Sequence, residues 1–118
     1  MKTLLLVDDS AVVRNICRVM LSPFNLQFRE ASNGREAVLE YQAHRPDAVL
    51  MDLRMPEMDG LEALREIKQF DPEARVAMVT SANQKQVVLS ALHYGICDYV
   101  VKPFEVVRLR ACVEKLLR

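Results

Sequence analysis

Short apolar runs that end on polar residues alternate along this chain with segments of helical periodicity. The first run, Leu4–Val7, holds four apolar residues and stops at two adjacent carboxylates, Asp8 and Asp9. A short continuous apolar run is typical of a strand buried on both faces, whereas apolar residues three and four positions apart are typical of an amphipathic helix. On these patterns, strands are predicted over Leu4–Asp8, Leu26–Ala31, Ala48–Met51, Val76–Val79 and Cys97–Val101.

Each predicted strand is followed by a predicted helix. The first helix begins after Ser10, a residue type that caps helices, and ends at Ser22-Pro23. The second helix follows Asn33-Gly34, the third follows Gly60, and the fourth covers Gln84–Tyr94. The last helix follows the fifth predicted strand. Five strand–helix units in strict alternation predict an α/β fold, in which helices cover both faces of a single parallel sheet.

The unusual polar residues fall at the ends of the predicted strands. Asp8 and Asp9 follow the first strand, Asp52 the third, Thr80 the fourth and Lys102 the fifth. Parallel strands end at one edge of the sheet, where sites of such folds lie, so we expect these side chains to meet. Each residue alone is also typical of a turn or a helix cap. Their joint placement at four strand ends favours a site.

Three clustered carboxylates repel one another and therefore favour a bound cation. Mg²⁺ prefers oxygen ligands and is usually held by one or two carboxylates and waters. Asp9 and Asp52 are candidate ligands, Asp8 could hold a metal-bound water, and Mn²⁺ could substitute for Mg²⁺. The Asp52 carboxylate could also act as a nucleophile toward phosphorus. Lys102 would then neutralise one phosphoryl oxygen, and Thr80 would donate a hydrogen bond to another.

Four stretches together resemble the response-regulator receiver domain of two-component signalling. They are "VDDS" with Arg14, "DLRMPEMDG", Thr80, and "DYVVKPF", in this order and at the separations of that family. The likeness covers residues 1–118, so it implies one receiver domain. It also implies the flavodoxin-like strand order 2-1-3-4-5.

The resemblance implies a role for each site residue. Asp52 is the expected phosphoacceptor, and the metal ligands are Asp8, Asp9, Asp52 and the backbone carbonyl of Arg54. Lys102, before a cis Pro103, is expected to pair with the phosphate. Thr80 and Tyr99 are the expected switch pair, in which the hydroxyl moves toward the phosphoryl group and the ring turns inward.

Two further expectations concern the surroundings of the site. The Arg54 side chain and Ala82 are predicted to lie at its mouth, where the guanidinium would affect the lifetime of the phosphate. In place of the family's usual Ala-Gly-Ala before the last strand, this chain has Tyr94-Gly95-Ile96. These larger residues predict a reshaped surface beside the fourth helix.

The resemblance implies a switch and not an enzyme, with self-phosphorylation from small phosphodonors and self-dephosphorylation as its only reactions. The implied donor is a histidine kinase or histidine phosphotransferase. The implied output is a protein target or a homodimer, bound through the fourth helix, fifth strand and fifth helix. The fourth helix has more apolar residues than one buried stripe needs, which fits either a partner surface or a wider buried face.

Other functions fit the pattern less well. A phosphorylation-independent adaptor of the same fold would not need the full acidic set and Lys102. A flavodoxin needs a hydroxyl- and glycine-rich phosphate loop after the first strand, where this chain has "DDSAVVR". Phosphatases with an aspartyl nucleophile usually place it in a DxD on the first strand, whereas Asp52 follows the third.

The composition restricts the possible partners and the cellular location of the protein. The 118 residues carry 16 basic and 16 acidic side chains, which argues against binding nucleic acid through a bulk basic field. The apolar runs are too short for a signal peptide or a membrane span, so we expect a cytoplasmic protein without membrane insertion. Cys17, Cys97 and Cys112 are expected to be reduced thiols. The chain fits either a stand-alone receiver or one cut from a longer protein, and Met1 close to the first strand favours a natural N-terminus.

Overall fold

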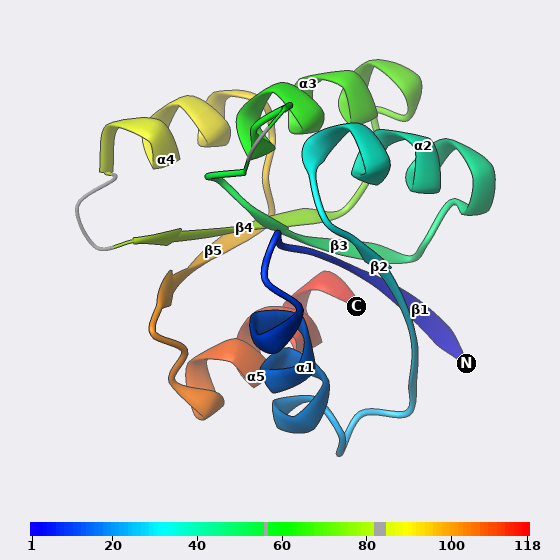
Figure 1. Cartoon of the computed structure of the whole chain (residues 1–118), viewed down its shortest axis with the longest axis vertical. Helices are drawn as coiled ribbons and strands as arrows, with labels where there is room; N and C mark the ends of the chain where they lie inside the picture. The colour runs from blue at the N-terminus through cyan, green and yellow to red at the C-terminus, as the bar shows by residue number, and fades with distance from the viewer. Residues whose placement is uncertain (56, 82–84) are drawn as a thin grey trace.

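A computed structural model describes residues 1–55, 57–81 and 85–118 (Figure 1). Strands and helices alternate as the hydrophobic pattern predicts. In chain order they are β1 (Lys2–Val7), α1 (Ala11–Met20), β2 (Leu26–Ala31), α2 (Gly34–His44), β3 (Ala48–Asp52), α3 (Gly60–Phe70), β4 (Val76–Ser81), α4 (Lys85–His93), β5 (Asp98–Lys102) and α5 (Val106–Leu116).

The strands form one parallel sheet in the order β2-β1-β3-β4-β5, which confirms the expected α/β topology. Figure 1 shows α1 and α5 on one face of the sheet and α2, α3 and α4 on the other. Because β1 lies between β2 and β3, the chain order reverses there. The carboxyl ends of β1 and β3 are therefore neighbours at the edge where sites of such sheets form.

The core has two halves, one on each face of the sheet. In β1, Leu4 and Leu6 pack toward α1 and α5, whereas Leu5 and Val7 pack toward α2, α3 and α4. Every residue of β3 is buried, as its unbroken apolar run predicts, while β2 at the edge has exposed positions. This two-sided burial holds the central strands rigidly and fixes where their carboxyl ends lie.

The predicted cap at Ser10 is confirmed, and α2 and α3 begin with caps of the same kind that were not predicted. The Ser10 hydroxyl accepts a hydrogen bond from the Val13 N–H (3.3 Å), and the Asn33 and Asp59 side chains accept one from Glu36 and Glu62 in the same way. These bonds satisfy N–H groups that have no partner within the helix. The N-cap of α1 begins directly after the Asp8–Asp9 pair, so it helps to define that turn.

Several boundaries differ by one or two residues from the sequence-based prediction. β1 begins at Lys2, because Lys2 and Thr3 pair with Leu26 and Gln27 in the sheet although their side chains are not buried. β5 lies one residue later than predicted, at Asp98–Lys102. The predicted helix start at Gln84 and the loop residue Pro56 lie outside the described residues.

Helix α4 is apolar on two sides. Val88 and Ala91 are buried against the sheet, whereas Leu89 and Leu92 are about half exposed. The apolar excess in this helix is thus not explained by burial alone. Within the described ranges, no helix is both long enough and apolar enough to cross a membrane.

Candidate functional site

The turn after β1 places two carboxylates in different environments. Asp8 is 5% exposed, and its N–H extends the sheet by donating to the Ala31 carbonyl (3.1 Å). Its Oδ1 accepts a hydrogen bond from the Ser10 N–H (2.9 Å). Asp9, the next residue, is exposed. The pair therefore offers one buried and one solvent-facing carboxylate at the same strand end.

Asp52 joins this pair because β3 runs beside β1. Val7 and Met51 are register partners, so Asp8 and Asp52 leave the sheet side by side. Asp8, Asp9 and Asp52 each offer an oxygen within 4.8 Å of the others, as predicted. A compact set of carboxylate oxygens with one open, exposed side fits Mg²⁺, which keeps several waters when bound.

Lys102 brings a positive charge into the cluster from the end of β5. Its Nζ lies 2.8 Å from Asp8 Oδ2 and 3.5 Å from Asp52 Oδ2. The sequence predicted that Lys102 pairs with a phosphoryl group on Asp52. In the structure its shorter contact is with Asp8, so the ammonium group lies between the two buried carboxylates. The Lys102–Pro103 peptide is cis, as the resemblance implied.

The pKa values of Asp52 and Lys102 are both raised in the folded chain. Burial and the nearby Asp8 charge raise the pKa of Asp52, and Lys102 partly opposes the rise. Burial lowers the pKa of Lys102, but the hydrogen bond to Asp8 and the charges of Asp52 and Asp8 outweigh it and raise the pKa. At an effective dielectric near 20, two like charges about 4 Å apart repel by roughly 4 kcal/mol. A divalent cation would relieve this repulsion more fully than Lys102 does.

Thr80 and Tyr99 lie on adjacent strands and point to the same face of the sheet. Thr80 pairs with Val101, two residues beyond Tyr99, and alternate residues of a strand share a face. Met78, also on this face, packs in the core half beneath α2, α3 and α4. Thr80 is 2% exposed and its hydroxyl donates to the Ser81 carbonyl (3.1 Å), whereas Tyr99 is 41% exposed. The Tyr99 ring thus lies outside in this structure, and the role of Thr80 and Tyr99 as a switch pair stays a prediction.

Arg54 follows β3 and is exposed beside a hollow of about 500 Å³. The hollow is lined by Leu53, Arg54, Met55, Asp59, Leu61 and Val87. The Arg54 backbone donates a hydrogen bond to the Asp52 carboxylate, which makes a small opposing contribution to the raised pKa of Asp52. This contact places the Arg54 backbone next to the cluster, while its carbonyl as a metal ligand stays a prediction. Ala82, predicted at the same mouth, lies outside the described residues.

The junction before β5 carries the unusual Tyr94-Gly95-Ile96. Gly95 has φ +85°, a conformation that glycine adopts without strain. Ile96 is buried, and the exposed Tyr94 ring lies 5.7 Å from the Arg65 guanidinium of α3. The larger residues therefore connect the end of α4 to α3.

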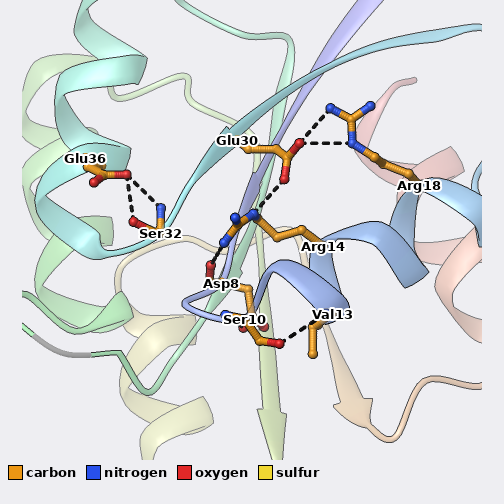
Figure 2. Close-up of polar contacts among 8 residues, drawn as sticks. All are labelled: Asp8, Ser10, Val13, Arg14, Arg18, Glu30, Ser32 and Glu36. Atoms are coloured by element: carbon orange, nitrogen blue, oxygen red, sulfur yellow. Dashed lines mark hydrogen bonds and ion pairs between the residues drawn. The ribbon is translucent and has the colours of Figure 1, made fainter.

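One contact at the site has only a weak signal in the sequence. Arg14, in the first turns of α1, donates to the backbone carbonyl of Asp8 (2.6 Å) and to the carboxylate of Glu30 (2.6 Å) (Figure 2). The sequence singled out Arg14 only as part of the "VDDS" motif. Its position four residues after Ser10 places it on α1, but the direction of its side chain depends on β2.

Comparison with known proteins agrees with this geometry. The family model described as "Response regulator receiver domain" matches residues 4–114. The chain therefore belongs to the response regulator receiver domain family.

Relatives of similar length include the chemotaxis protein CheY of Bacillus subtilis, which is 42% identical over 97% of this chain and 96% of that protein. The regulatory protein AtoC of Escherichia coli is 39% identical over 98% of this chain but only 25% of its own length. Among solved structures, the receiver domain of NtrX from Brucella abortus superposes with a TM-score of 0.90 at 30% identity, covering 97% of each chain. The chain thus matches nearly the full length of one relative and about a quarter of another.

Proposed function

We propose that this chain is a phosphorylation-dependent switch, with residues 1–118 as one receiver domain and Asp52 as its phosphoacceptor. The observation that carries the proposal is the meeting of Asp52 with Asp8, Asp9 and Lys102 at one sheet edge, in a member of the receiver family. Asp52 is 7% exposed, so only a donor that enters this edge can reach it.

The proposed reaction is transfer of a phosphoryl group from a phosphohistidine. An Asp52 carboxylate oxygen attacks phosphorus, a P–O bond forms and the P–N bond breaks. The leaving imidazole nitrogen keeps the electron pair and takes a proton from solvent. Lys102 and the Thr80 hydroxyl would stabilise the charge on the phosphoryl oxygens. Attack of water on phosphorus later releases phosphate and restores the carboxylate.

Asp8, Asp9 and Asp52, with the Arg54 carbonyl, are the residues that would hold Mg²⁺ or Mn²⁺. When bound, the cation would supply positive charge against the carboxylates and the phosphoryl oxygens. The carboxylate cluster supports this assignment, since its donor set is the one Mg²⁺ prefers. The Arg54 side chain would limit access of water to the phosphate without changing the affinity for the cation.

The proposed output is a change of the surface made by α4, β5 and α5. Movement of the Thr80 hydroxyl toward the phosphate leaves space that the Tyr99 ring can fill. Leu89, Leu92 and Val107 are exposed on α4 and α5 and could contact a protein target or a second copy. The donor would be a histidine kinase or a histidine phosphotransferase, and the setting cytoplasmic, without direct contact to nucleic acid.

Phosphorylation of intact protein tests the proposal. Incubation with acetyl phosphate and Mg²⁺ should add one base-labile phosphoryl group, measured by intact mass spectrometry. Asp52→Asn should abolish the added mass. Asp59→Asn is the matched control, because asparagine also caps helices and Asp59 lies outside the cluster. Full labelling of Asp52→Asn would refute the assignment, and absence of labelling in the wild type would favour the adaptor function.

A further inference from the structure

The backbone of the Asp8–Asp9 turn is held by a side chain from α1. Arg14 donates from Nη1 to the Asp8 carbonyl oxygen (2.6 Å) and from Nε to Glu30 Oε1 (2.6 Å). Figure 2 shows the guanidinium between these two acceptors, which come from the end of β1 and from β2. The Arg14 side chain is only 16% exposed, so its position is well defined.

The carbonyl that Arg14 holds belongs to the peptide between Asp8 and Asp9. A peptide unit is planar, so fixing its oxygen also fixes the N–H and the Cα of the following residue. The other side of Asp8 is already fixed, since its N–H donates to Ala31 and its Oδ1 accepts from Ser10. Asp9 is exposed, so the direction of its Cα–Cβ bond depends on the backbone around it, and this peptide plane sets the position of its N and Cα atoms.

Glu30 in turn holds Arg14 in place. Its second oxygen accepts hydrogen bonds from Arg18 Nη2 (2.7 Å) and Nε (3.1 Å), so one carboxylate joins two guanidinium groups. The hydrogen bond from Arg14, followed by that from Arg18, lowers the pKa of Glu30 below its ordinary value. Glu30 therefore keeps its charge at neutral pH and stays available to both arginines.

We propose that Arg14 is a positioning residue for the divalent-cation site, acting through the Asp8–Asp9 peptide on the direction of the Asp9 carboxylate. The inference rests on the proposed function, because it takes the Asp8, Asp9 and Asp52 cluster to be a cation site. Arg14 itself donates to the backbone carbonyl of Asp8 and to Glu30. In the described contacts it does not donate to any of the proposed ligand oxygens.

Charge and positioning predict opposite effects of removing Arg14. As a cation near a cation site, Arg14 repels the metal, so its loss would by charge alone tighten metal binding. As a positioning residue it holds a ligand in place, and loss of such outer partners typically weakens metal affinity by about 10- to 100-fold. The sign of the change therefore separates the two roles.

The test measures affinity for the metal alone. Mn²⁺ is titrated into the full chain and the free ion is followed by electron paramagnetic resonance. We expect Arg14→Ala to weaken binding by about tenfold. Arg18→Ala is the control, since it loses both Arg18 hydrogen bonds to Glu30 and a positive charge, whereas the described contacts of Arg18 do not include Asp8. Its affinity should stay near the wild-type value, and Arg14→Lys, which retains a donor, should recover part of the loss.

Several outcomes would overturn the proposal. Arg14→Ala binding Mn²⁺ as tightly as the wild type, or more tightly, would show that the arginine does not position a ligand. Equal weakening in Arg14→Ala and Arg18→Ala would show a general structural effect of the Glu30 cluster. If Arg14→Ala does not fold, Arg14→Met, which keeps an unbranched side chain but has no hydrogen-bond donor, replaces it with the same expectation.

The wild type and Asp9→Ala separate this proposal from the proposed function. If the wild type binds Mn²⁺ and Asp9→Ala does not, the cation site stands whatever Arg14 does. If the wild type itself binds no Mn²⁺, both the cation site and the role of Arg14 are refuted.

Discussion

Asp52 is a buried carboxylate whose charge is unfavourable in the folded chain. Burial and the Asp8 charge raise its pKa above 3.8, so the folded state disfavours the ionised form. We predict that Asp52→Asn raises the free energy of unfolding at pH 7 in metal-free buffer, by roughly 1 kcal/mol, a usual size for a single substitution. Urea unfolding measures the difference, with Asp59→Asn as a control that should not change stability.

The pH dependence of this difference has a definite sign. Above the raised pKa of folded Asp52, its charge lowers the free energy of unfolding by the full amount. This loss of stability disappears as the pH falls toward the unfolded-state pKa of Asp52, near 3.8. The advantage of Asp52→Asn over the wild type should shrink across that window. An advantage that is the same at pH 7 and near pH 4 would mean that it does not arise from the charge.

The proposed Thr80–Tyr99 switch would transmit a change at two residues to α4, β5 and α5. Thr80 is buried beside β5, and Tyr99 lies exposed on the same face of the sheet. A phosphoryl group can change the conformation only through contacts that differ between the two states, and Thr80 offers such a contact. We predict that phosphorylation, or its beryllofluoride mimic, shifts amide NMR signals along α4, β5 and α5. In Thr80→Ala these shifts should be smaller although phosphate is still accepted.

Thr3→Ala is the control for this experiment, because Thr3 lies at the opposite end of β1. It should leave the phosphorylation-dependent shifts at their wild-type size. If the phosphorylation-dependent NMR shifts keep their full size in Thr80→Ala, the conformational change does not depend on Thr80.

A second element-level contact joins α2 to the turn after α3, near the residues where β3 and β4 begin and not at their carboxyl ends. The buried Tyr41 donates from its hydroxyl to Asp71 Oδ2 (2.7 Å), and Arg45 lies 3.6 Å from the same oxygen. The Tyr41 hydrogen bond lowers the pKa of Asp71. We predict that Tyr41→Phe costs about 1.5 kcal/mol of stability at pH 7, the size expected for a hydrogen bond to a charged group.

This contribution should also depend on pH. A carboxylate whose pKa is lowered by folding stabilises the fold above its unfolded pKa and loses this effect as the pH falls through its folded pKa. The stability difference between the wild type and Tyr41→Phe should therefore narrow below about pH 4. Tyr94→Phe, at an exposed tyrosine, is the control and should have no such pH-dependent difference. A difference unchanged by acid would refute the assigned role of the Asp71 charge.

How well each strand or helix could be predicted from the sequence depends on how its residues are buried. The first four residues of β3, Ala48–Met51, are apolar, and all of β3 is buried, so the hydrophobic pattern alone identified this strand up to Asp52. β1 and β5 were shifted at their ends, because pairing with a neighbouring strand extends a strand over residues with polar or exposed side chains. For α4 the sequence could not decide between burial and a free surface, since only the packing shows that Leu89 and Leu92 face outward.

At the scale of the whole molecule, the candidate site depends on contacts between distant parts of the chain. The sequence placed the polar residues at one sheet edge because parallel strands end together, and this holds for Asp8, Asp9, Asp52 and Lys102. It could not show that Lys102 lies nearer to Asp8 than to Asp52, since that depends on how a long side chain crosses the edge from β5. The same applies to Arg14, whose acceptors lie on two different strands.

Binding of a cation by the acidic cluster would also affect the stability of the whole domain. The three carboxylates come together only in the folded chain, so a cation that binds them stabilises the folded state over the unfolded one. We predict that Mg²⁺ raises the free energy of unfolding, by about 2.7 kcal/mol when its concentration is one hundred times the dissociation constant. Urea unfolding over a series of Mg²⁺ concentrations, with a chelator as the zero point, measures this gain.

Two substitutions test whether the stabilisation by Mg²⁺ arises at the acidic cluster. Asp9→Ala removes an exposed carboxylate of the cluster without touching the apolar core, so it should retain the metal-free stability and lose most of the gain from Mg²⁺. Asp47→Asn, at the opposite end of the sheet where the Asp47 carboxylate accepts from the Thr3 N–H, should keep the gain in full. If Mg²⁺ stabilises Asp9→Ala as much as the wild type, the cation acts elsewhere and the cluster does not hold it. A gain that follows the dissociation constant measured by titration would instead tie the stability of the entire domain to these three side chains.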